Sequence, residues 1–307
     1  MSSTPFVVAF SADTDRKKDD EEGADPDSVF KKIVKEKPDR YVFGGDGPYS
    51  KKKAKEWTEL IDKYNLKGII KIAQGNHDCN ESESRKTEQD IEEWMPDLRK
   101  TPEVNKDEKN WTKSKWIHTW QDNNAFFIVM NSSDLDIKFK RNHYNWVVKQ
   151  LAIAKKLKDE GKVDWIFGIM HKPWYTLKTK HSPEIEIRRI YQPLFDELGV
   201  DFMLYGHNHD HQVWLPMVFD AKQEFTRLPD GSFDFSAPHG QFHIVNGAGG
   251  HEVEKFEEDW KDNQNVLYAN DKEFCYTLFK INGKTCEVIT KNVDDEPKTI
   301  FSMRVTK

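Results

Sequence analysis

Five short polar strings, each preceded by a hydrophobic run, constrain this chain more than any other feature. They are Ala-Asp-Thr-Asp at residues 12–15, Gly-Asp-Gly-Pro-Tyr at 45–49, Gly-Asn-His-Asp at 75–78, His-Lys-Pro-Trp at 171–174 and Gly-His-Asn-His at 206–209. An apolar run that ends at a polar side chain, often after a glycine, is typical of a buried strand followed by a sharp turn. Ligands collect at the carboxyl ends of strands in layered α/β folds, so we expect the five strings to meet at one edge of the sheets.

Alternating strand and helix patterns predict one α/β domain over residues 1–307. Apolar runs predict strands at 6–10, 41–43, 69–73, 125–130, 165–170 and 201–205, and apolar residues at helical spacing predict helices from residue 25 onward and at 51–64, 146–157 and 184–198. After residue 206 the pattern predicts strands at 243–245, 276–281, 286–290 and 300–305, with a hairpin at Asn282-Gly283. We expect a four-layer α/β/β/α sandwich of two mixed sheets flanked by helices. The segments 92–120 and 216–239 match no simple pattern.

The amino-acid composition limits the classes of function that this chain can have. The 307 residues are 33% charged and 36% hydrophobic with a net charge of −6, which favours a soluble globular protein and not a general nucleic-acid binder. No stretch approaches the ~18 apolar residues of a membrane span, so no membrane partner is expected. No signal peptide is visible at the N-terminus, which predicts a cytoplasmic setting, or a secreted one if a leader has been removed.

Cysteine usage fits a reduced setting. The chain has three cysteines, Cys79, Cys275 and Cys286, which is too few for a disulfide framework. Cys275 and Cys286 fall on two strands that the pattern pairs, so a single bridge between them is the alternative.

The polar side chains at the strand ends are those that bind metals. Carboxylate and amide oxygens suit hard cations, and imidazole suits borderline transition metals. The strings supply both kinds at Asp13, Asp46, Asn76, His171, His207 and His209. A single Gly-Asp or Gly-Asn-His is more often an ordinary turn, but six such positions in one context favour a metal site. The sequence therefore predicts a dinuclear metal hydrolase.

At these residues the chain resembles the calcineurin-like metallophosphoesterases, and within them the purple acid phosphatases. The matching motifs are Gly-Asp-x-x-Tyr, Gly-Asn-His-Asp, His-Lys-Pro-Trp-Tyr and Gly-His-x-His, in family order over nearly the whole chain. The resemblance implies one metal held by Asp13, Asp46, Tyr49 and His209, and a second held by Asp46, Asn76, His171 and His207. Asp46 would bridge the two ions, which suits a separation of ~3.5–4 Å.

The resemblance also implies an activity, the hydrolysis of phosphomonoesters by a metal-activated hydroxide, as in an acid phosphatase. His77 would contact the phosphate or protonate the leaving oxygen, and His181 is carried over as a second catalytic histidine. The expected cofactors are two metal ions, iron with zinc, manganese or a second iron, and the expected partner is a phosphate ester. A phosphodiesterase or nuclease on the same core, and a non-catalytic metal-binding scaffold, are the alternatives.

The sequence departs from the family pattern at three points. Asp15 stands where the family has Gly or His, so either Tyr49 or Asp15 could complete the first metal site. The residues after His209 differ from those of plant members, which predicts a different substrate-facing edge. The first strand is predicted near the start of the given sequence, so the chain is expected to resemble the compact form of the family, without an added N-terminal β-sandwich. The remaining histidines are a separate matter. Five of them are expected to be structural or superficial: His118, His143, His239, His243 and His251. For His211, both a structural and a functional role remain open.

Overall fold

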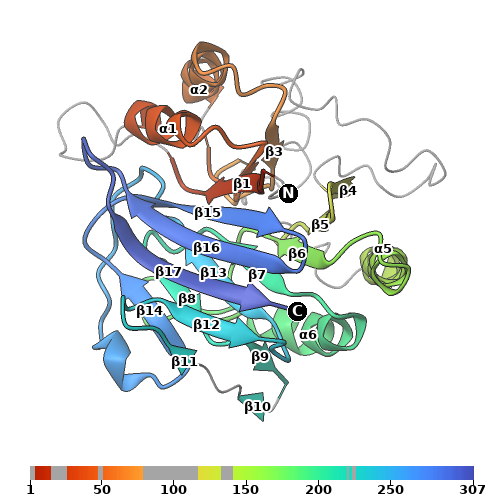
Figure 1. Ribbon diagram of the computed structural model, residues 1–307. Helices are drawn as coiled ribbons and strands as arrows, with labels where there is room; N and C mark the ends of the chain where they lie inside the picture. The colour runs from red at the N-terminus through yellow and green to blue at the C-terminus, as the bar shows by residue number, and fades with distance from the viewer. Residues whose placement is uncertain are drawn as a thin grey trace.

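A computed structural model describes residues 4–14, 26–47, 51–78, 117–132, 141–219, 221–222 and 226–307. Two mixed sheets lie face to face, and helices cover the outer face of each (Figure 1). The predicted α/β sandwich of two mixed sheets flanked by helices is confirmed.

The first sheet has eight strands in the order β11-β12-β17-β16-β15-β1-β2-β3. Its strands are β1 (Phe6–Ser11), β2 (Arg40–Phe43), β3 (Ile70–Ile72), β15 (Cys275–Asn282), β16 (Thr285–Asn292), β17 (Thr299–Thr306), β12 (Phe233–Ser236) and β11 (Thr226–Arg227). β1, β2 and β3 run parallel, whereas β15 pairs antiparallel with β1. The carboxyl ends of the three parallel strands, where three of the five strings begin, therefore lie at one edge of the sheet.

The second sheet has seven strands in the order β14-β8-β13-β7-β6-β5-β4. Its strands are β4 (His118–Asp122), β5 (Ala125–Val129), β6 (Trp165–Ile169), β7 (Phe202–Tyr205), β8 (His211–Trp214), β13 (Phe242–Asn246) and β14 (Val266–Asn270). The neighbours β5, β6, β7 and β13 run parallel. The two remaining strings follow β6 and β7. A separate small hairpin joins β9 (Met217–Val218) to β10 (Ala221–Lys222).

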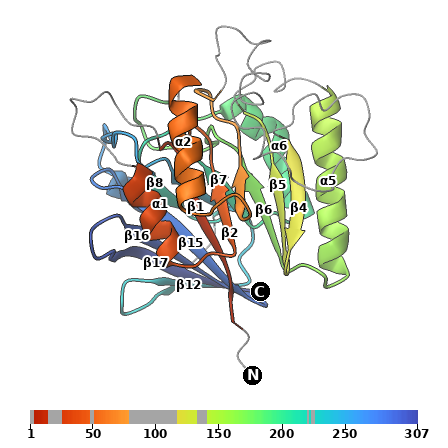
Figure 2. The ribbon, with the colours of Figure 1, turned by 90° about the horizontal axis from the view of Figure 1, so that it is seen from above.

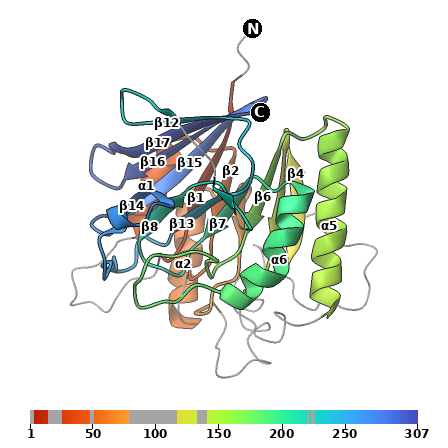
Figure 3. The ribbon, with the colours of Figure 1, turned by 90° about the horizontal axis from the view of Figure 1, so that it is seen from below.

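Among the described residues, two pairs of helices form the outer layers. α1 (Pro26–Lys35) and α2 (Lys51–Lys63) lie against the first sheet, and α5 (Arg141–Asp159) and α6 (Ile185–Leu198) lie against the second (Figures 2 and 3). α6 ends where Gly199 takes a φ of 72°, a left-handed conformation that glycine adopts without steric cost. No helix within the described ranges is long and apolar enough to cross a membrane.

A row of stacked aromatic rings crosses the second sheet on the face that meets the first. The rings are those of Trp120, Phe127, Phe167, Phe202 and Phe242, one from each of β4, β5, β6, β7 and β13. Successive centroids lie 4.7, 5.0, 5.0 and 5.4 Å apart. Phe279 of the first sheet meets two of these rings edge-on. Each such pair adds about 0.5–1.5 kcal/mol beyond its burial, so the row stabilises the pairing of neighbouring strands and hence the alignment of their ends.

Three features of the fold differ from the expectation. Strands β4, β8, β12 and β14 and the two-residue strands β9, β10 and β11 were not predicted, and α5 begins at Arg141, five residues before the predicted position 146. The bridge considered between Cys275 and Cys286 is wrong, because the register of β15 and β16 pairs Cys275 with Asn292 and Cys286 with Ile281. Both thiols are free and buried.

Buried His243 gives the fold a specific dependence on pH. Its Nδ1 and the Tyr205 hydroxyl share a hydrogen bond of 2.8 Å, and burial lowers the pKa of His243 to about 3. Because this pKa lies below the ordinary value of 6.5, the stabilisation is complete above pH 6.5 and is lost as the pH falls toward 3. We expect the wild type to lose about 2 kcal/mol relative to His243→Gln between pH 7 and pH 5. Urea unfolding of both proteins at each pH measures this difference, and parallel losses would contradict it.

Candidate metal centre

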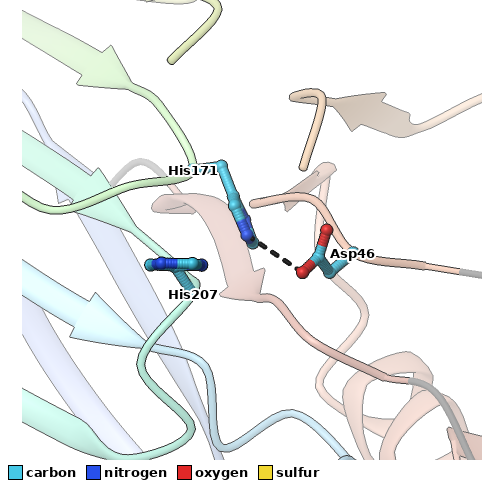
Figure 4. Close-up of side chains that lie close together, drawn as sticks. All are labelled: Asp46, His171 and His207. Carbon is cyan, nitrogen blue, oxygen red and sulfur yellow. Dashed lines mark ion pairs between the residues drawn. The ribbon is translucent and has the colours of Figure 1, made fainter. Parts of the chain in front are cut away.

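The described residues of the five strings converge where the edges of the two sheets meet, and three of their side chains form a compact group. Asp46 follows β2, while His171 and His207 follow β6 and β7 of the other sheet (Figure 4). Each contributes one potential ligand atom, and these atoms all lie within 4.8 Å of one another. His171 Nε2 is 3.1 Å from Asp46 Oδ2, and the rings of His171 and His207 are 5.1 Å apart.

Three further predicted ligands border this group. Asn76 Oδ1 lies 3.1 Å from His171 Nε2. Asp13 Oδ1 lies 4.0 Å from the same nitrogen and 3.5 Å from His209 Nε2. Asp13 thus lies between His171 and His209, and the side chains that we expect to hold two ions are adjacent. Their role as ligands stays a prediction, and Tyr49 and Asp15 lie outside the described residues.

The backbone is strained at three of these positions. Asp13, Asp46 and His207 have φ values of 58°, 56° and 72°, in the left-handed region. A residue other than glycine in this region costs of order 1–3 kcal/mol, and such residues cluster at functional sites. Backbone bonds between two loops hold the first two in place: Asp13 N–H donates to the Gly45 carbonyl, and Thr14 N–H donates to the Asp46 carbonyl. The strained turns direct both carboxylates toward the histidines of the other sheet.

Each of the two carboxylates has one oxygen held by backbone and another that faces histidine. Asp13 Oδ2 accepts from His207 N–H and Asp46 Oδ1 accepts from His77 N–H, both at 2.8 Å. Asp13 Oδ1 is buried and accepts no hydrogen bond from the described part of the chain. A buried carboxylate oxygen that accepts no hydrogen bond costs free energy, whereas a bound cation would satisfy it. The residues present therefore fit a metal.

Two glycines make room for these carboxylates. A Cβ at Gly206 would lie 2.6 Å from Asp13 Oδ2, and one at Gly75 would lie 2.0 Å from Asp46 Oδ1. Any side chain at either position would push a carboxylate out of place. The glycine in the strings at residues 75–78 and 206–209 is therefore required by the close approach of the strand ends.

Asp78 joins the loop after β2 to the loop after β3. Its Oδ2 accepts from Asp46 N–H and Gly75 N–H, both at 2.8 Å, and its Oδ1 accepts from Gly47 N–H at 2.9 Å. Burial and the nearby charge of Asp46 raise the pKa of Asp78 to about 6, so the carboxylate is ionised at neutral pH. The third string thus supplies a clamp as well as a predicted ligand, a role that the motif alone did not reveal.

The charges of the site suit a cation. Burial raises the pKa of Asp46, but the charge and hydrogen bond of His171 outweigh burial, and the pKa lies below its usual range. Burial lowers the pKa of His171, but Asp46 and Asp13 raise it to about 9. His171 is therefore protonated in the metal-free protein, and a metal would replace that proton. Burial and the charge of His171 hold the pKa of His207 well below its usual value, so His207 is a neutral imidazole. Carboxylate, amide oxygen and imidazole together fit iron, manganese or zinc.

Other histidines lie around the site. The His181 ring is 4.0 Å from that of His207, which places this predicted catalytic residue beside the group. The His251 ring lies 4.3 Å from that of His209, and His251 N–H donates to the Asp13 carbonyl at 2.8 Å. His251 was expected to be structural or superficial, and the sequence signal next to it is the glycine-rich stretch at 246–250. His211 bonds to the Val245 carbonyl and the Thr290 hydroxyl, which favours a structural role.

In the part of the chain that the structure describes, two mixed sheets with four helices form an α/β sandwich of the metallophosphoesterase type, and carboxylates and histidines meet at their shared edge. The chain belongs to the calcineurin-like phosphoesterase family, whose profile matches residues 19–211. Among curated proteins, purple acid phosphatase 18 of Arabidopsis thaliana is 27% identical over 173 residues, 55% of this chain and 35% of that protein. Purple acid phosphatase 22 of the same plant is 28% identical over 123 residues, 40% of this chain and 24% of that protein. These matches therefore span about a third or less of the relatives' length.

Solved structures share the fold. Purple acid phosphatase PPD1 of yellow lupin superposes with a TM-score of 0.77 at 16% identity, over 100% of this chain and 54% of that one. GAP50, described as the anchor in the inner membrane complex of Plasmodium, superposes with a TM-score of 0.62 at 16% identity, over 99% of this chain and 89% of that one. At such identities the likeness establishes the architecture alone.

Proposed function

We propose that the protein is a dinuclear metal-dependent phosphomonoesterase of the acid phosphatase type. The observation that carries the proposal is the group formed by Asp46, His171 and His207, whose ligand atoms lie within 4.8 Å of one another at the seam of a calcineurin-like fold. Asp13, Asn76 and His209 border that group and could provide the remaining donors. A phosphate ester is the substrate class that the family implies.

The proposed ligands divide between two ions that share Asp46. Asp13 and His209 would hold the first ion, with Tyr49 or Asp15 as a further ligand. Asn76, His171 and His207 would hold the second. When bound, the metals lower the pKa of a water and stabilise negative charge on the phosphate. The fixed carboxylates and the neutral His207 are arranged before binding, so little reorganisation is needed.

We assign the transfer of a proton to the leaving oxygen to His77. This residue follows Asn76 directly, and its own N–H is held by the Asp46 carboxylate at 2.8 Å. The histidine is thereby tied to the centre without being one of the proposed ligands. His181, beside His207, would contact the phosphate.

The replacement His77→Ala is expected to keep both metals and to lower kcat for p-nitrophenyl phosphate by ~10²–10³-fold, because a general acid is lost while the ligands remain. Steady-state kinetics and metal content of the same preparation measure the two effects. His239→Ala, in the loop before β13, is the matched control and should behave as wild type. An unchanged kcat would remove His77 from the mechanism.

Metal content and substrate preference test the function as a whole. The protein is reconstituted with iron, zinc and manganese, and hydrolysis of p-nitrophenyl phosphate is compared with that of bis(p-nitrophenyl) phosphate. Two ions per chain and faster monoester turnover support the proposal. Faster diester turnover would favour a phosphodiesterase, and bound metal without turnover would favour a scaffold. A visible charge-transfer band would place Tyr49 on Fe(III), whereas a colourless protein would favour Asp15.

A further inference from the structure

An acidic side chain outside the five strings faces the metal centre. Glu254 lies in the loop between β13 and β14, and its N–H donates to the His209 carbonyl at 2.8 Å. Its side chain is 4% exposed, and Oε1 lies 3.3 Å from Lys180 Nζ, 3.8 Å from His181 Nε2 and 3.9 Å from His209 Nδ1. Three basic groups therefore surround one carboxylate oxygen, and one of them belongs to a proposed ligand.

The two ligand histidines that face Asp13 are supported in parallel ways. His171 Nδ1 bonds to the Gly44 carbonyl at 2.9 Å, and its Nε2 faces the carboxylates. His209 directs Nε2 toward Asp13 and Nδ1 toward Glu254. A histidine that binds a metal through one nitrogen needs an acceptor near the other, because that acceptor fixes the tautomer and the ring orientation. Glu254 faces His209 Nδ1 at 3.9 Å, compared with 2.9 Å for the Gly44 bond to His171, so it acts on His209 through its charge and not through a direct hydrogen bond.

Because Glu254 is buried, interaction of its carboxylate with positive charge is strongly favourable. Its Oε2 is buried and accepts no hydrogen bond from the described residues. A carboxylate removed from water is stable only when cations lie close by. The backbone bond to His209 holds the main chain of Glu254 next to this histidine. Lys180 is itself 69% exposed and holds one side of the carboxylate. The other side faces the imidazoles.

We propose that Glu254 is a positioning residue of the metal centre, whose carboxylate orients His209 toward the first metal and holds His181 beside His207. The inference rests on the proposed function, because it assigns Glu254 to the metals on which that function depends. A narrower role is an ion pair with Lys180 that only anchors the loop. The two roles make different predictions, because only the first requires the contact with His209.

Glu254→Gln tests the proposal, since it keeps the shape of the side chain and removes its charge. We expect this variant to release metal to a chelator ~10–100-fold faster than wild type, with the unfolding temperature of the metal-free protein unchanged. Glu257→Gln is the matched control, because Glu257 lies on the same loop in an exposed pair with Lys178 at 2.7 Å. Lys180→Met removes the ion pair and leaves the His209 contact. Both of these variants should release metal at the wild-type rate.

The outcomes separate the two levels of inference. Wild-type protein that binds no metal after reconstitution would overturn the proposed function itself. Wild-type protein that binds two metals, together with a Glu254→Gln variant that releases them at the same rate, would overturn the role of Glu254 alone. If Lys180→Met and Glu254→Gln accelerate metal release equally, Glu254 only anchors its loop through the ion pair with Lys180. If Glu254→Gln does not fold, Glu254→Asp takes its place, because the retracted carboxylate should likewise release metal faster.

Discussion

Replacing Asp46 by asparagine is expected to remove both metals and to lower phosphoester hydrolysis by at least ~10³-fold. Both carboxylate oxygens are in use: Oδ1 accepts from His77 N–H at 2.8 Å, and Oδ2 lies 3.1 Å from His171 Nε2. An amide offers one oxygen. In either orientation its NH₂ group would face a donor or a metal, and the negative charge that both ions share would be gone.

Metal analysis and turnover of Asp46→Asn measure this result directly. Asp39→Asn is the matched control, because Asp39 lies at the opposite end of β2 and its carboxylate accepts from Val7 N–H at 2.8 Å, a bond that asparagine retains. The control should keep full metal content. Two fully occupied metal sites in Asp46→Asn would contradict a bridging Asp46, even if activity were reduced.

Asp78→Ala should have the largest effect on stability, a loss of about 3–5 kcal/mol in the metal-free protein. Three backbone N–H groups, of Asp46, Gly47 and Gly75, would lose their acceptor, and each buried unsatisfied donor costs about 1–3 kcal/mol before relaxation. The loops that carry Asp46 and Asn76 would separate, so metal affinity should fall as well.

Denaturant unfolding of the metal-free proteins measures the loss, which keeps the stability effect apart from the loss of metal. Asp78→Asn gives a graded comparison, because an amide oxygen can still accept two of the three bonds while its NH₂ group opposes the remaining donor. The asparagine variant should therefore fall between wild type and alanine. Wild-type stability in Asp78→Ala would show that the clamp contributes little.

Where side chains follow directly from strand ends, the sequence was sufficient to predict that they lie close together, and their role as metal ligands stays a prediction. Asp13 and Asp46 meet because the parallel strands β1 and β2 place their carboxyl ends at the same edge of the first sheet. His171 follows β6 of the second sheet and reaches them because the two sheets pack face to face. Glu254 and His251 could not be predicted in the same way. They reach His209 through the closure of the loop between β13 and β14, for which no local pattern exists.

The missed strands have a related cause. β4 and β8 read His-Thr-Trp-Gln-Asp and His-Gln-Val-Trp, so polar residues interrupt the apolar pattern. In β8 the polar residues are nonetheless buried, since His211 bonds to Thr290 of the other sheet and the side-chain oxygen of Gln212 accepts from Leu177 N–H. Partners far along the chain make burial of these polar groups favourable. A prediction from local periodicity has no access to those partners.

The position of the centre on the seam between the sheets also has a mechanical consequence. Apolar contacts such as those of the aromatic row resist separation of two layers, but they are non-directional and resist sliding far less. Ion coordination is directional, and the proposed ions would draw ligands from both layers, with Asp46 on one side and His171 and His207 on the other. With the metals in place, any shear between the layers would stretch metal–ligand bonds. The alignment of the two sheets would then determine the geometry of the metal ligands. A distant change that shifts one sheet would therefore also change the positions of the metals relative to the bound phosphate.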